Sequence, residues 1–237
     1  AAAGLGRAEA IGLARSGATV VVNDMAAALD VSDVLDEIAS AGAKAVAVAG
    51  DISARSTADE LITCAEDLGG LDIVVNNAGI TKDNLMLRMK GDDWDEVINT
   101  NLSSIFRTTK AVLKGMTKAR WGRIINIASL QSYRAFPNST PYGAAKGGIL
   151  QLTRAIAQEW SKFGITCNAI GPGFFPTALT APVFNNSELV KMHANRTAIG
   201  RNGEMSDIGG LAIFLASDAS SYITGQTIML DGGYTAS

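Results

Sequence analysis

The chain has 237 residues, of which 47% are hydrophobic and 18% are charged, and its formal net charge is −3 at pH 7. This composition supports a sizeable core, excludes an intrinsically disordered chain, and lacks the basic clusters that a nucleic-acid partner requires. No apolar stretch is long enough to span a bilayer and no secretory signal is visible, so we expect a cytoplasmic protein without a membrane partner.

Short apolar strands alternate with helices along the whole chain. The predicted strands are Thr19–Asn23, Ala45–Ala49, Ile73–Val75, Gly122–Ile127, Thr166–Ile170 and Thr227–Leu230. The predicted helices are Leu5–Ser16, Val31–Ser40, Thr57–Leu68, Trp94–Lys118, Tyr142–Lys162 and Ser206–Ala216. Continuous apolar runs are typical of parallel strands that are buried on both faces. We therefore predict the α/β class: one doubly wound parallel sheet with helices on both faces, in a single domain over residues 1–237.

A glycine-rich turn formed by Gly4, Leu5 and Gly6 leads into the first predicted helix. Glycines let a backbone approach a pyrophosphate, and the helix N-terminus supplies oriented N–H groups. A doubly wound sheet has its central strand immediately before such a turn. We therefore expect the natural protein to carry further residues before Ala1, because loss of a central strand would badly destabilise the sheet.

Asp24 follows this turn and ends the first predicted strand. A carboxylate at this place can accept hydrogen bonds from the adenosine ribose hydroxyls, and it would repel a 2′-phosphate. Asp24 therefore favours NAD(H) as the cofactor, without excluding NADP(H). The plainer alternative is that Asp24 only ends the strand or caps a turn.

Polar and small residues also follow the next two predicted strands. Asp51 and Ile52 come after the strand that ends at Ala49, and Asp51 can accept a hydrogen bond from the adenine amino group. The segment from Asn77 through Ala78 to Gly79 is small enough for a flat ring to lie against its backbone. Ligands of open α/β sheets bind outside the carboxyl ends of the strands, so these residues are predicted to line one cofactor site.

Tyr142 and Lys146 are four residues apart on one predicted helix, which places both side chains on the same face. Lys146 and an oxidised nicotinamide, both positive, are expected to lower the pKa of the Tyr142 phenol. Ser129, at the end of a strand, can hydrogen-bond a substrate carbonyl oxygen. Asn101 is a poor helix former inside a long helix, where it can kink the helix or hold a water that links Lys146 to solvent. The plainer alternatives are a surface pair, a strand-end cap and a satisfied buried amide.

Histidine and cysteine usage argues against other classes. The single histidine, His193, has no second histidine or cysteine near it in the sequence, so we expect no metal site. A hydrolase based on His193 would need a G-x-S-x-G elbow, which is absent. Cys64 and Cys167 are expected to be buried thiols, because no secretory signal accompanies them.

Taken together and in this order, these segments resemble the short-chain dehydrogenase/reductase family. The matching segments are Gly4-Leu-Gly6, Asn76-Asn-Ala-Gly79, Asn101, Ser129, Tyr142-x-x-x-Lys146 and Pro172-Gly173. The resemblance implies a Rossmann-like domain, a bound nicotinamide cofactor, a homotetramer built on the two long helices, and a catalytic tetrad of Asn101, Ser129, Tyr142 and Lys146. It also implies that Pro172, Gly173 and Thr177 border the nicotinamide. The Thr-Gly that usually opens the family's glycine motif is absent.

Within that family the segments point to more than one substrate. Asn76 to Met89, Asn101 to Arg107 and Leu230 to Gly233 look like 3-oxoacyl-[acyl-carrier-protein] reductases. Val22 to Met25 resembles NAD-dependent (3R)-hydroxyacyl-CoA dehydrogenases, and Gln131 to Ala181 resembles gluconate 5-dehydrogenase-like sugar or polyol dehydrogenases. The resemblance implies hydride transfer between a nicotinamide and a ketone or secondary alcohol, with 3-oxoacyl thioester reduction first and the other two as alternatives. A catalytically silent nucleotide-binding protein is the alternative from a different class.

The loop-rich stretch around 174–203 is predicted to be a lid over the substrate. Its large apolar side chains either line a pocket suited to an acyl chain or fill the lid's own small core. They are Phe174, Phe175, Leu179 and Phe184. In the reducing direction, Tyr142 is expected to donate its proton to the developing alkoxide, while Ser129 stabilises the same oxygen.

Overall fold

The strands of the protein are short, parallel and separated by helices. The computed structural model describes residues 1–25 and 31–236. The strands are β1 (Val20–Asp24), β2 (Ala45–Ala49), β3 (Ile73–Asn76), β4 (Gly122–Ile127), β5 (Ile165–Pro172) and β6 (Thr227–Leu230). The bounds predicted for β2, β4 and β6 are confirmed without change, and the other strands differ from the prediction by one or two residues at an end.

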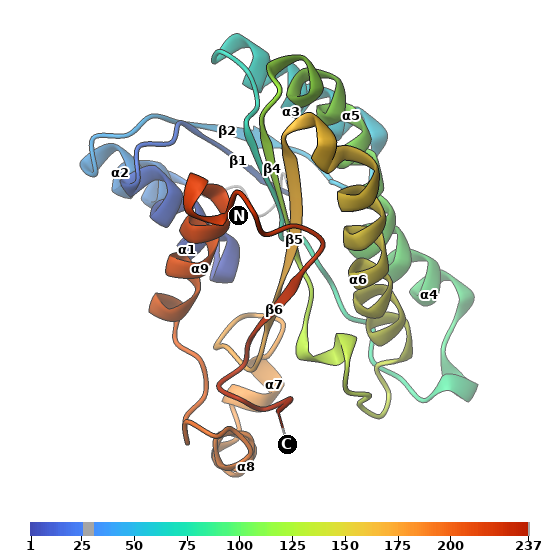
Figure 1. The fold of residues 1–237 in the computed structure, drawn as a ribbon. Coiled ribbons are helices and arrows are strands. Elements are labelled where there is room, and N and C mark those ends of the chain that lie inside the picture. The colour runs from blue at the N-terminus through green and yellow to red at the C-terminus, as the bar shows by residue number, and fades with distance from the viewer. Residues whose placement is uncertain (26–30, 237) are drawn as a thin grey trace.

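The helices cover both faces of these strands (Figure 1). They are α1 (Gly4–Arg15), α2 (Ser32–Ser40), α3 (Arg55–Asp67), α4 (Gly91–Ile98), α5 (Ser104–Ala119), α6 (Thr140–Trp160), α7 (Ala181–Phe184), α8 (Ser187–Asn195) and α9 (Met205–Ala216). Helices α1, α2 and α9 lie on one side, and α3, α5 and α6 lie on the other. The arrangement confirms the predicted α/β class with helices on both faces.

The strands pair in two groups rather than in one continuous sheet. In one group β1 pairs with β2, from Val20 beside Ala45 to Asp24 beside Ala49. The other group has the order β3-β4-β5-β6, and all pairs in both groups are parallel. Within the described residues no strand lies between β1 and β3, so the expected single sheet is divided at that point. A cavity extends into this gap between the two strands.

The core lies on the two faces of β4 and β5, where alternate side chains point to opposite layers of helices. Ile125 and Ile127 pack with Leu13 of α1 and Ile208 of α9 on one face. On the other face the packed side chains belong to α5, α6, β4 and β5. They are Val112, Met116, Ile124, Ile156, Ile165 and Cys167. Every residue of β4 and β5 is buried, so these strands form the rigid centre of the fold.

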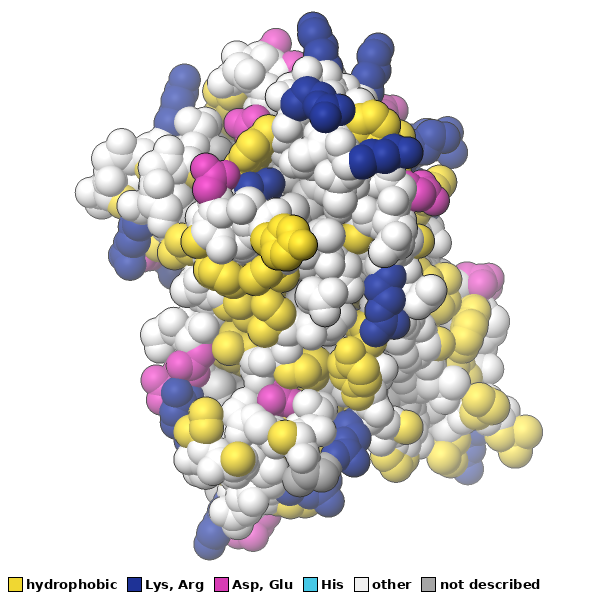
Figure 2. Space-filling view, viewed as in Figure 1, with side chains coloured by type: hydrophobic (Ala, Val, Ile, Leu, Met, Phe, Trp, Pro, Cys, Tyr) yellow, Lys and Arg dark blue, Asp and Glu magenta, His cyan; other side chains and the backbone are white. Residues whose placement is uncertain are grey.

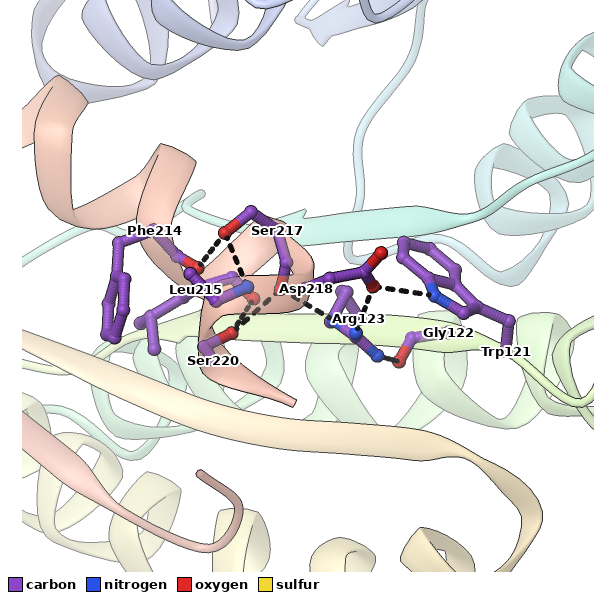
Figure 3. A network of polar contacts seen from close by, with 9 residues as sticks. Trp121, Gly122, Arg123, Phe214, Leu215, Ser217, Asp218 and Ser220 are labelled. Carbon is purple, nitrogen blue, oxygen red and sulfur yellow. Dashed lines mark hydrogen bonds and ion pairs between the residues drawn. The ribbon is translucent and has the colours of Figure 1, made fainter. Parts of the chain in front are cut away.

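A buried arginine fastens the amino end of β4 to the segment after α9 (Figure 3). Arg123 is 3% exposed, and its guanidinium lies 4.3 Å from the centre of the Trp121 ring. It donates to the Asp218 carboxylate at 3.1 Å and to the backbone carbonyls of Gly122 and Ser217. A buried charge is tolerated when it is paired and hydrogen-bonded in this way. The contacts lie at the amino end of β4, whereas the predicted site residues follow the carboxyl ends of the strands.

The helix predicted over Trp94–Lys118 is confirmed as a continuous helical stretch from Gly91 to Ala119, but it is not regular throughout. The structure has α4 and α5 with a π-helical turn at Asn99–Ser103 between them. Helix α6 starts at Thr140, two residues before the prediction, and Pro141 in its first turn needs no hydrogen-bonded N–H there. Among the described residues no helix is both long and apolar enough to cross a membrane.

The surface shown in Figure 2 carries basic and acidic side chains side by side. Lys and Arg are spread over this face, Asp and Glu lie among them, and the basic groups form no continuous patch there. Hydrophobic side chains gather mainly across the middle of the same face. This distribution agrees with the net charge of −3 and gives no electrostatic footprint for nucleic acid on that face.

Candidate active site

One cavity of about 1250 Å³ opens at the carboxyl ends of the strands. It is lined by every cofactor-binding residue predicted from the sequence, and by three of the four predicted catalytic residues. The cofactor-binding residues are Gly4, Leu5, Gly6, Asp24, Asp51, Ile52, Asn77, Ala78, Gly79, Tyr142, Lys146, Pro172, Gly173 and Thr177. The catalytic residues on its wall are Ser129, Tyr142 and Lys146, whereas Asn101 lies behind the wall. The structure thus brings together segments that are more than 150 residues apart in the chain.

The glycine-rich turn leaves no room for side chains. Gly4 has a φ of +60°, and a Cβ atom there would lie 3.4 Å from Thr177 Cγ2. A Cβ on Gly6 would lie 2.5 Å from Nδ2 of Asn77, closer than real Cβ contacts allow. The turn therefore lies directly against the segments that follow β3 and β5. Bare backbone facing a cavity at the start of α1 fits the pyrophosphate of a dinucleotide.

Asp24 lies at the end of β1 with its carboxylate held by backbone groups. Its Oδ2 accepts hydrogen bonds from the amino group of Ala1 at 2.9 Å and from the Ala2 N–H at 2.8 Å, and its Oδ1 accepts from Met25 N–H. Partial burial raises the pKa of Asp24, but the hydrogen bonds from Ala2, Ala1 and Met25 outweigh it, so the pKa is lower than usual. The carboxylate is therefore ionised at neutral pH, and its contact with a ribose stays a prediction.

Asp51 and the segment after β3 also follow strand ends, as predicted. Asp51 Oδ1 accepts the Ser53 N–H at 2.8 Å and so caps its own turn on the surface. Beyond Asn77, a Cβ on Gly79 would lie 3.6 Å from both Lys146 Nζ and Asn101 Oδ1. Gly79 therefore lies beside these two polar groups, at a distance where a Cβ atom would make ordinary van der Waals contact.

Ser129, Tyr142 and Lys146 meet at one end of the cavity. Ser129 follows β4, and its hydroxyl hydrogen-bonds the Tyr142 phenol, which is 8% exposed. Lys146 lies one helical turn further along α6, with its Nζ 5.6 Å from the centre of the Tyr142 ring. This ammonium donates to the carbonyl of Ile127 at 2.6 Å. The predicted spacing on one helix face therefore produces the predicted cluster.

Burial sets the protonation of this cluster. Desolvation raises the pKa of the Tyr142 phenol, the hydrogen bond from Ser129 lowers it, and the nearby charge of Asp83 raises it again. The net pKa lies above the usual value, so Tyr142 holds its proton at neutral pH. Desolvation lowers the pKa of Lys146 to about 8. The expected lowering of the tyrosine pKa is thus not produced by Lys146 alone, and for the complex with oxidised nicotinamide it stays a prediction.

Asn101 is fully buried in the π-helical turn between α4 and α5. Its Oδ1 accepts the Ile80 N–H at 2.8 Å, and its Nδ2 donates to the Ile80 carbonyl at 2.9 Å. The asparagine therefore fastens the loop after β3 to the interrupted helix. The interruption at Asn101 agrees with the predicted kink, and the buried amide is satisfied. A water-mediated link to Lys146 stays a prediction.

Sequence reasoning missed a buried polar network beneath the cavity. Asn76 Nδ2 donates to Asn126 Oδ1 at 2.9 Å, and Thr108 Oγ1 donates to Asn76 Oδ1 at 2.6 Å. Asn126 Nδ2 in turn donates to Thr153 Oγ1 at 2.9 Å. The network joins β3 and β4 to α5 and α6 just below the site. Asparagines inside otherwise apolar strands were the available signal, since buried polar groups require partners.

Glu9 of α1 was also missed. It is 1% exposed, lines the same cavity, and neither carboxyl oxygen has a hydrogen-bond partner among the described residues. Desolvation raises the pKa of Glu9 to about 8, against the opposing charges of the Ala1 amino group and Lys146. The carboxyl group is therefore mostly neutral at pH 7.

The stretch 174–203 contains α7 and α8 and closes one side of the cavity. Phe174, Phe175 and Leu179 line the cavity, whereas Phe184 is not part of its lining. Phe174 also stacks on the His193 ring with centroids 3.7 Å apart. Phe174 thus lines the cavity and also packs within the lid, and a pocket suited to an acyl chain stays a prediction.

The histidine and the two cysteines are not part of the cluster formed by Ser129, Tyr142 and Lys146. His193 Nδ1 lies 3.3 Å from the Tyr234 hydroxyl, a partner in the C-terminal segment. Cys64 and Cys167 are free thiols, as expected, although Cys64 is only half-buried. Within residues 1–25 and 31–236, no group of three or more His, Cys, Asp or Glu could hold a metal ion.

Comparison with known proteins gives a consistent result. The profile of the family described as "Enoyl-(Acyl carrier protein) reductase" matches residues 1–235. The hydroxyacyl-CoA dehydrogenase ChsB1 of Mycobacterium tuberculosis is 46% identical, over 98% of this chain and 75% of that protein. The 3-oxoacyl-[acyl-carrier-protein] reductase FabG of Pseudomonas aeruginosa is 42% identical, over 98% of this chain and 94% of that protein.

A solved structure of similar fold extends the comparison to a bound cofactor. It is the gluconate 5-dehydrogenase of Burkholderia cenocepacia in complex with NADP and tartrate, with a TM-score of 0.93 and 34% identity. The alignment covers 100% of this chain and 92% of that chain. The fold, the cavity and these relatives agree, and the chain therefore belongs to the short-chain dehydrogenase/reductase family of NAD(P)-dependent oxidoreductases.

Proposed function

We propose that this protein reduces the ketone of 3-oxoacyl thioesters with a nicotinamide cofactor. The observation that carries the proposal is the meeting of Ser129, Tyr142 and Lys146 on the wall of the cavity that begins at the glycine-rich turn. The relatives named 3-oxoacyl-[acyl-carrier-protein] reductase and hydroxyacyl-CoA dehydrogenase support an acyl thioester as the substrate.

The residues around the cavity fit a dinucleotide. Gly4 and Gly6 leave bare backbone at the start of α1, where a diphosphate binds to free N–H groups. Pro172, Gly173 and Thr177 would border the nicotinamide, and Lys146 would bind a ribose hydroxyl. When bound, the reduced nicotinamide supplies the hydride that adds to the ketone carbon.

The chain's own residues handle the charge and the proton. Ser129 and Tyr142 hold the ketone oxygen between their hydroxyl groups, and Tyr142 transfers its proton to that oxygen as negative charge develops. Burial raises the tyrosine pKa and so keeps this proton in place until it is needed. Lys146 holds a positive charge beside the phenol and favours the phenolate left behind. Asn101 holds the loop after β3 against Lys146 and supports the path by which the proton is replaced.

We propose NAD(H) as the preferred cofactor, with NADP(H) not excluded. The ionised Asp24 carboxylate at the end of β1 is placed to accept from ribose hydroxyls and to repel a 2′-phosphate. The gluconate 5-dehydrogenase of similar fold binds NADP, so the preference in this chain depends on its own residues. We further propose a cytoplasmic homotetramer built on α5 and α6, which light scattering of the purified protein would test.

The reduction of sugar or polyol ketones is the second candidate. It is favoured by the likeness in fold to the gluconate 5-dehydrogenase. Acetoacetyl-CoA and 5-ketogluconate, each assayed with NADH and NADPH, distinguish the two candidates. We expect a higher kcat/KM with acetoacetyl-CoA and NADH, and a preference for the keto sugar would overturn the proposed substrate.

Tyr142→Phe tests the catalytic role. We expect kcat to fall by about 100- to 10,000-fold, the usual contribution of a general acid, with NADH binding retained. Tyr133→Phe is the matched control, because Tyr133 is 53% exposed and does not line the cavity. Unchanged activity of Tyr142→Phe would refute the role of the phenol and favour another proton donor.

A further inference from the structure

A polar side chain that the mechanism does not use lies beside the catalytic serine. Gln131 belongs to the single helical turn Leu130–Ser132 that follows Ser129. Its backbone N–H donates to Ser129 Oγ at 3.1 Å, and Ser132 Oγ donates to the Lys146 carbonyl at 2.8 Å. These bonds fix the turn relative to both Ser129 and α6. The position of Gln131 is therefore set by the same elements that place the catalytic groups.

The carboxamide of Gln131 makes no hydrogen bond with the described residues. Its Oε1 is buried without a partner, and the side chain lines the cavity. A Cβ placed on Gly143 would lie 3.9 Å from Oε1, so the amide lies against the first turn of α6, next to Tyr142. A buried polar group without a partner costs stability and is uncommon in folded proteins. Oε1 can only accept a hydrogen bond and is fully buried, whereas Nε2 makes no hydrogen bond with the described residues and is not among the fully buried atoms. The N–H donor is therefore the end of the amide that a ligand in the cavity can reach.

The polar groups next to Tyr142 are already assigned to another partner or cannot donate a hydrogen bond to a further substrate atom. Ser129 and Tyr142 are hydrogen-bonded to each other and are assigned to the ketone oxygen. The Lys146 ammonium donates to the Ile127 carbonyl, and Asp83, whose charge acts on Tyr142, is a carboxylate that accepts but does not donate. Gln131 therefore adds a neutral N–H donor that the protein itself leaves unused.

We infer that the Gln131 carboxamide donates a hydrogen bond to the thioester carbonyl oxygen of the substrate, and so makes the site selective for 3-oxoacyl groups over isolated ketones. This inference rests on the proposed function. In a 3-oxoacyl thioester the second carbonyl is two carbons from the reacting ketone, and its oxygen only accepts hydrogen bonds. Holding both oxygens stops rotation about the chain between them. Gln131 therefore also fixes which face of the ketone meets the hydride donor.

Two matched substrates isolate this hydrogen bond. Acetoacetyl-N-acetylcysteamine carries both carbonyls, and S-(3-oxobutyl)-N-acetylcysteamine is the thioether that lacks only the thioester oxygen. Gln131→Met keeps the volume of the side chain and removes the donor, and Gln131→Glu replaces it with a charge that repels the carbonyl oxygen. Gln158→Met is the matched control, because Gln158 is an exposed residue of α6 outside this cavity.

We expect Gln131→Met to lower kcat/KM for the thioester by roughly tenfold, which corresponds to the upper range of the contribution of one hydrogen bond. Gln131→Glu should lower kcat/KM for the thioester further. Both variants should change kcat/KM for the thioether less than twofold. The enantiomeric ratio of the 3-hydroxy thioester product should also fall in both variants, an effect that loss of packing alone would not produce. Retained NADH binding in either variant shows that the site is folded.

The outcomes separate the inference from the proposed function. Equal losses on both substrates, or no loss on either, would overturn the role of Gln131 while leaving the proposed function intact. If the unmodified protein turns over neither acetoacetyl thioester nor acetoacetyl-CoA, the proposed function fails and the inference fails with it. A thioester-selective loss in the two Gln131 variants, absent in Gln158→Met, supports the inference.

Discussion

The two groups of strands differ in burial, and the difference follows the number of strands that each strand has beside it. Every residue of β4 and β5 is buried, whereas only Val22 is buried in β1 and no residue is buried in β2. Strands β4 and β5 have a strand on each side and helices on both faces, but β1 pairs with β2 alone. The proposed catalytic groups are positioned by β4 and β5, since Ser129 follows β4 and α6 packs on β5. Asp24, for which we propose recognition of the adenosine half of the cofactor, is the last residue of β1.

This contrast teaches that proton transfer and cofactor recognition make different demands on the scaffold. The hydroxyl groups of Ser129 and Tyr142 must hold one oxygen at hydrogen-bond distance, and small misplacements reduce the rate steeply. A carboxylate that accepts from ribose hydroxyls tolerates more movement. The cavity continues between β1 and β3, where the described residues contain no strand.

The largest expected effect on stability comes from truncating a buried side chain in the strand pair β4 and β5. Ile170 of β5 is 0% exposed and packs with Ile125, Ile127 and Ile208. We expect Ile170→Ala to lower the free energy of unfolding by about 2–5 kcal/mol, because it removes buried methyl groups and leaves a cavity. Val48→Ala in the half-buried β2 should lower it by about 1 kcal/mol or less. Denaturant unfolding measures both, and similar losses in the two variants would contradict the comparison.

A second test uses the buried carboxyl of Glu9, which lies where the two groups of strands meet. Burial raises its pKa from 4.5 to about 8. Between these pH values the unfolded chain releases the proton while the folded protein keeps it, so stability falls as pH rises from about 5 to about 8. Glu9→Gln should abolish this slope. At pH 8 we expect a gain on the order of 2 kcal/mol, less than the full cost of charging, since glutamine still buries an amide.

The pH window matters for the Glu9 measurement. The pKa of Lys146 is lowered from 10.5 to about 8, which makes stability rise between these values, opposite to the effect of Glu9. Thermal unfolding should therefore be followed from pH 5 to pH 7, where Lys146 stays mostly charged in both states. Asp36→Asn, a change at an acidic position of α2 outside the cavity, serves as the control. An unchanged slope in Glu9→Gln would show that another group carries the pH dependence.

The sequence was sufficient where local patterns decide the structure. The runs of β2 and β6 end where Gly50 and Asp231 begin, and their bounds, like those of β4, were predicted without error. The four-residue spacing of Tyr142 and Lys146 was equally local. Asn101 was recognised as a poor helix former, but its two hydrogen bonds to Ile80 are long-range. They accompany the π-helical turn that divides the predicted helix, which no pattern within the helix reveals.

Other features depend on contacts that no local pattern reports. Glu9 lies three residues after Gly6 in an amphipathic helix, and only the packing around α1 shows that its carboxyl is buried. Gln131 was not singled out from the sequence, and the lack of a partner for its Oε1 is visible only once the turn is placed against α6.

The smallest expected effect concerns Asp24 and separates recognition from chemistry. Asp24→Ser removes the ionised carboxylate and keeps a small hydrogen-bonding side chain at the end of β1. We expect the ratio of the NADPH and NADH dissociation constants to fall by about tenfold, because repulsion of the 2′-phosphate is lost and the ribose loses an acceptor. Fluorescence titration at low and high salt measures the ratio, and screening should reduce the difference between the variant and the unmodified protein. Asp51→Ser, which removes an exposed carboxylate from the neighbouring turn, should change the ratio less.

Since β4 and β5 are untouched, kcat with saturating cofactor should stay within about twofold in Asp24→Ser. A large fall in kcat would show that the less buried strands β1 and β2 also position the reacting groups. Cofactor recognition and proton transfer would then not depend on different strands.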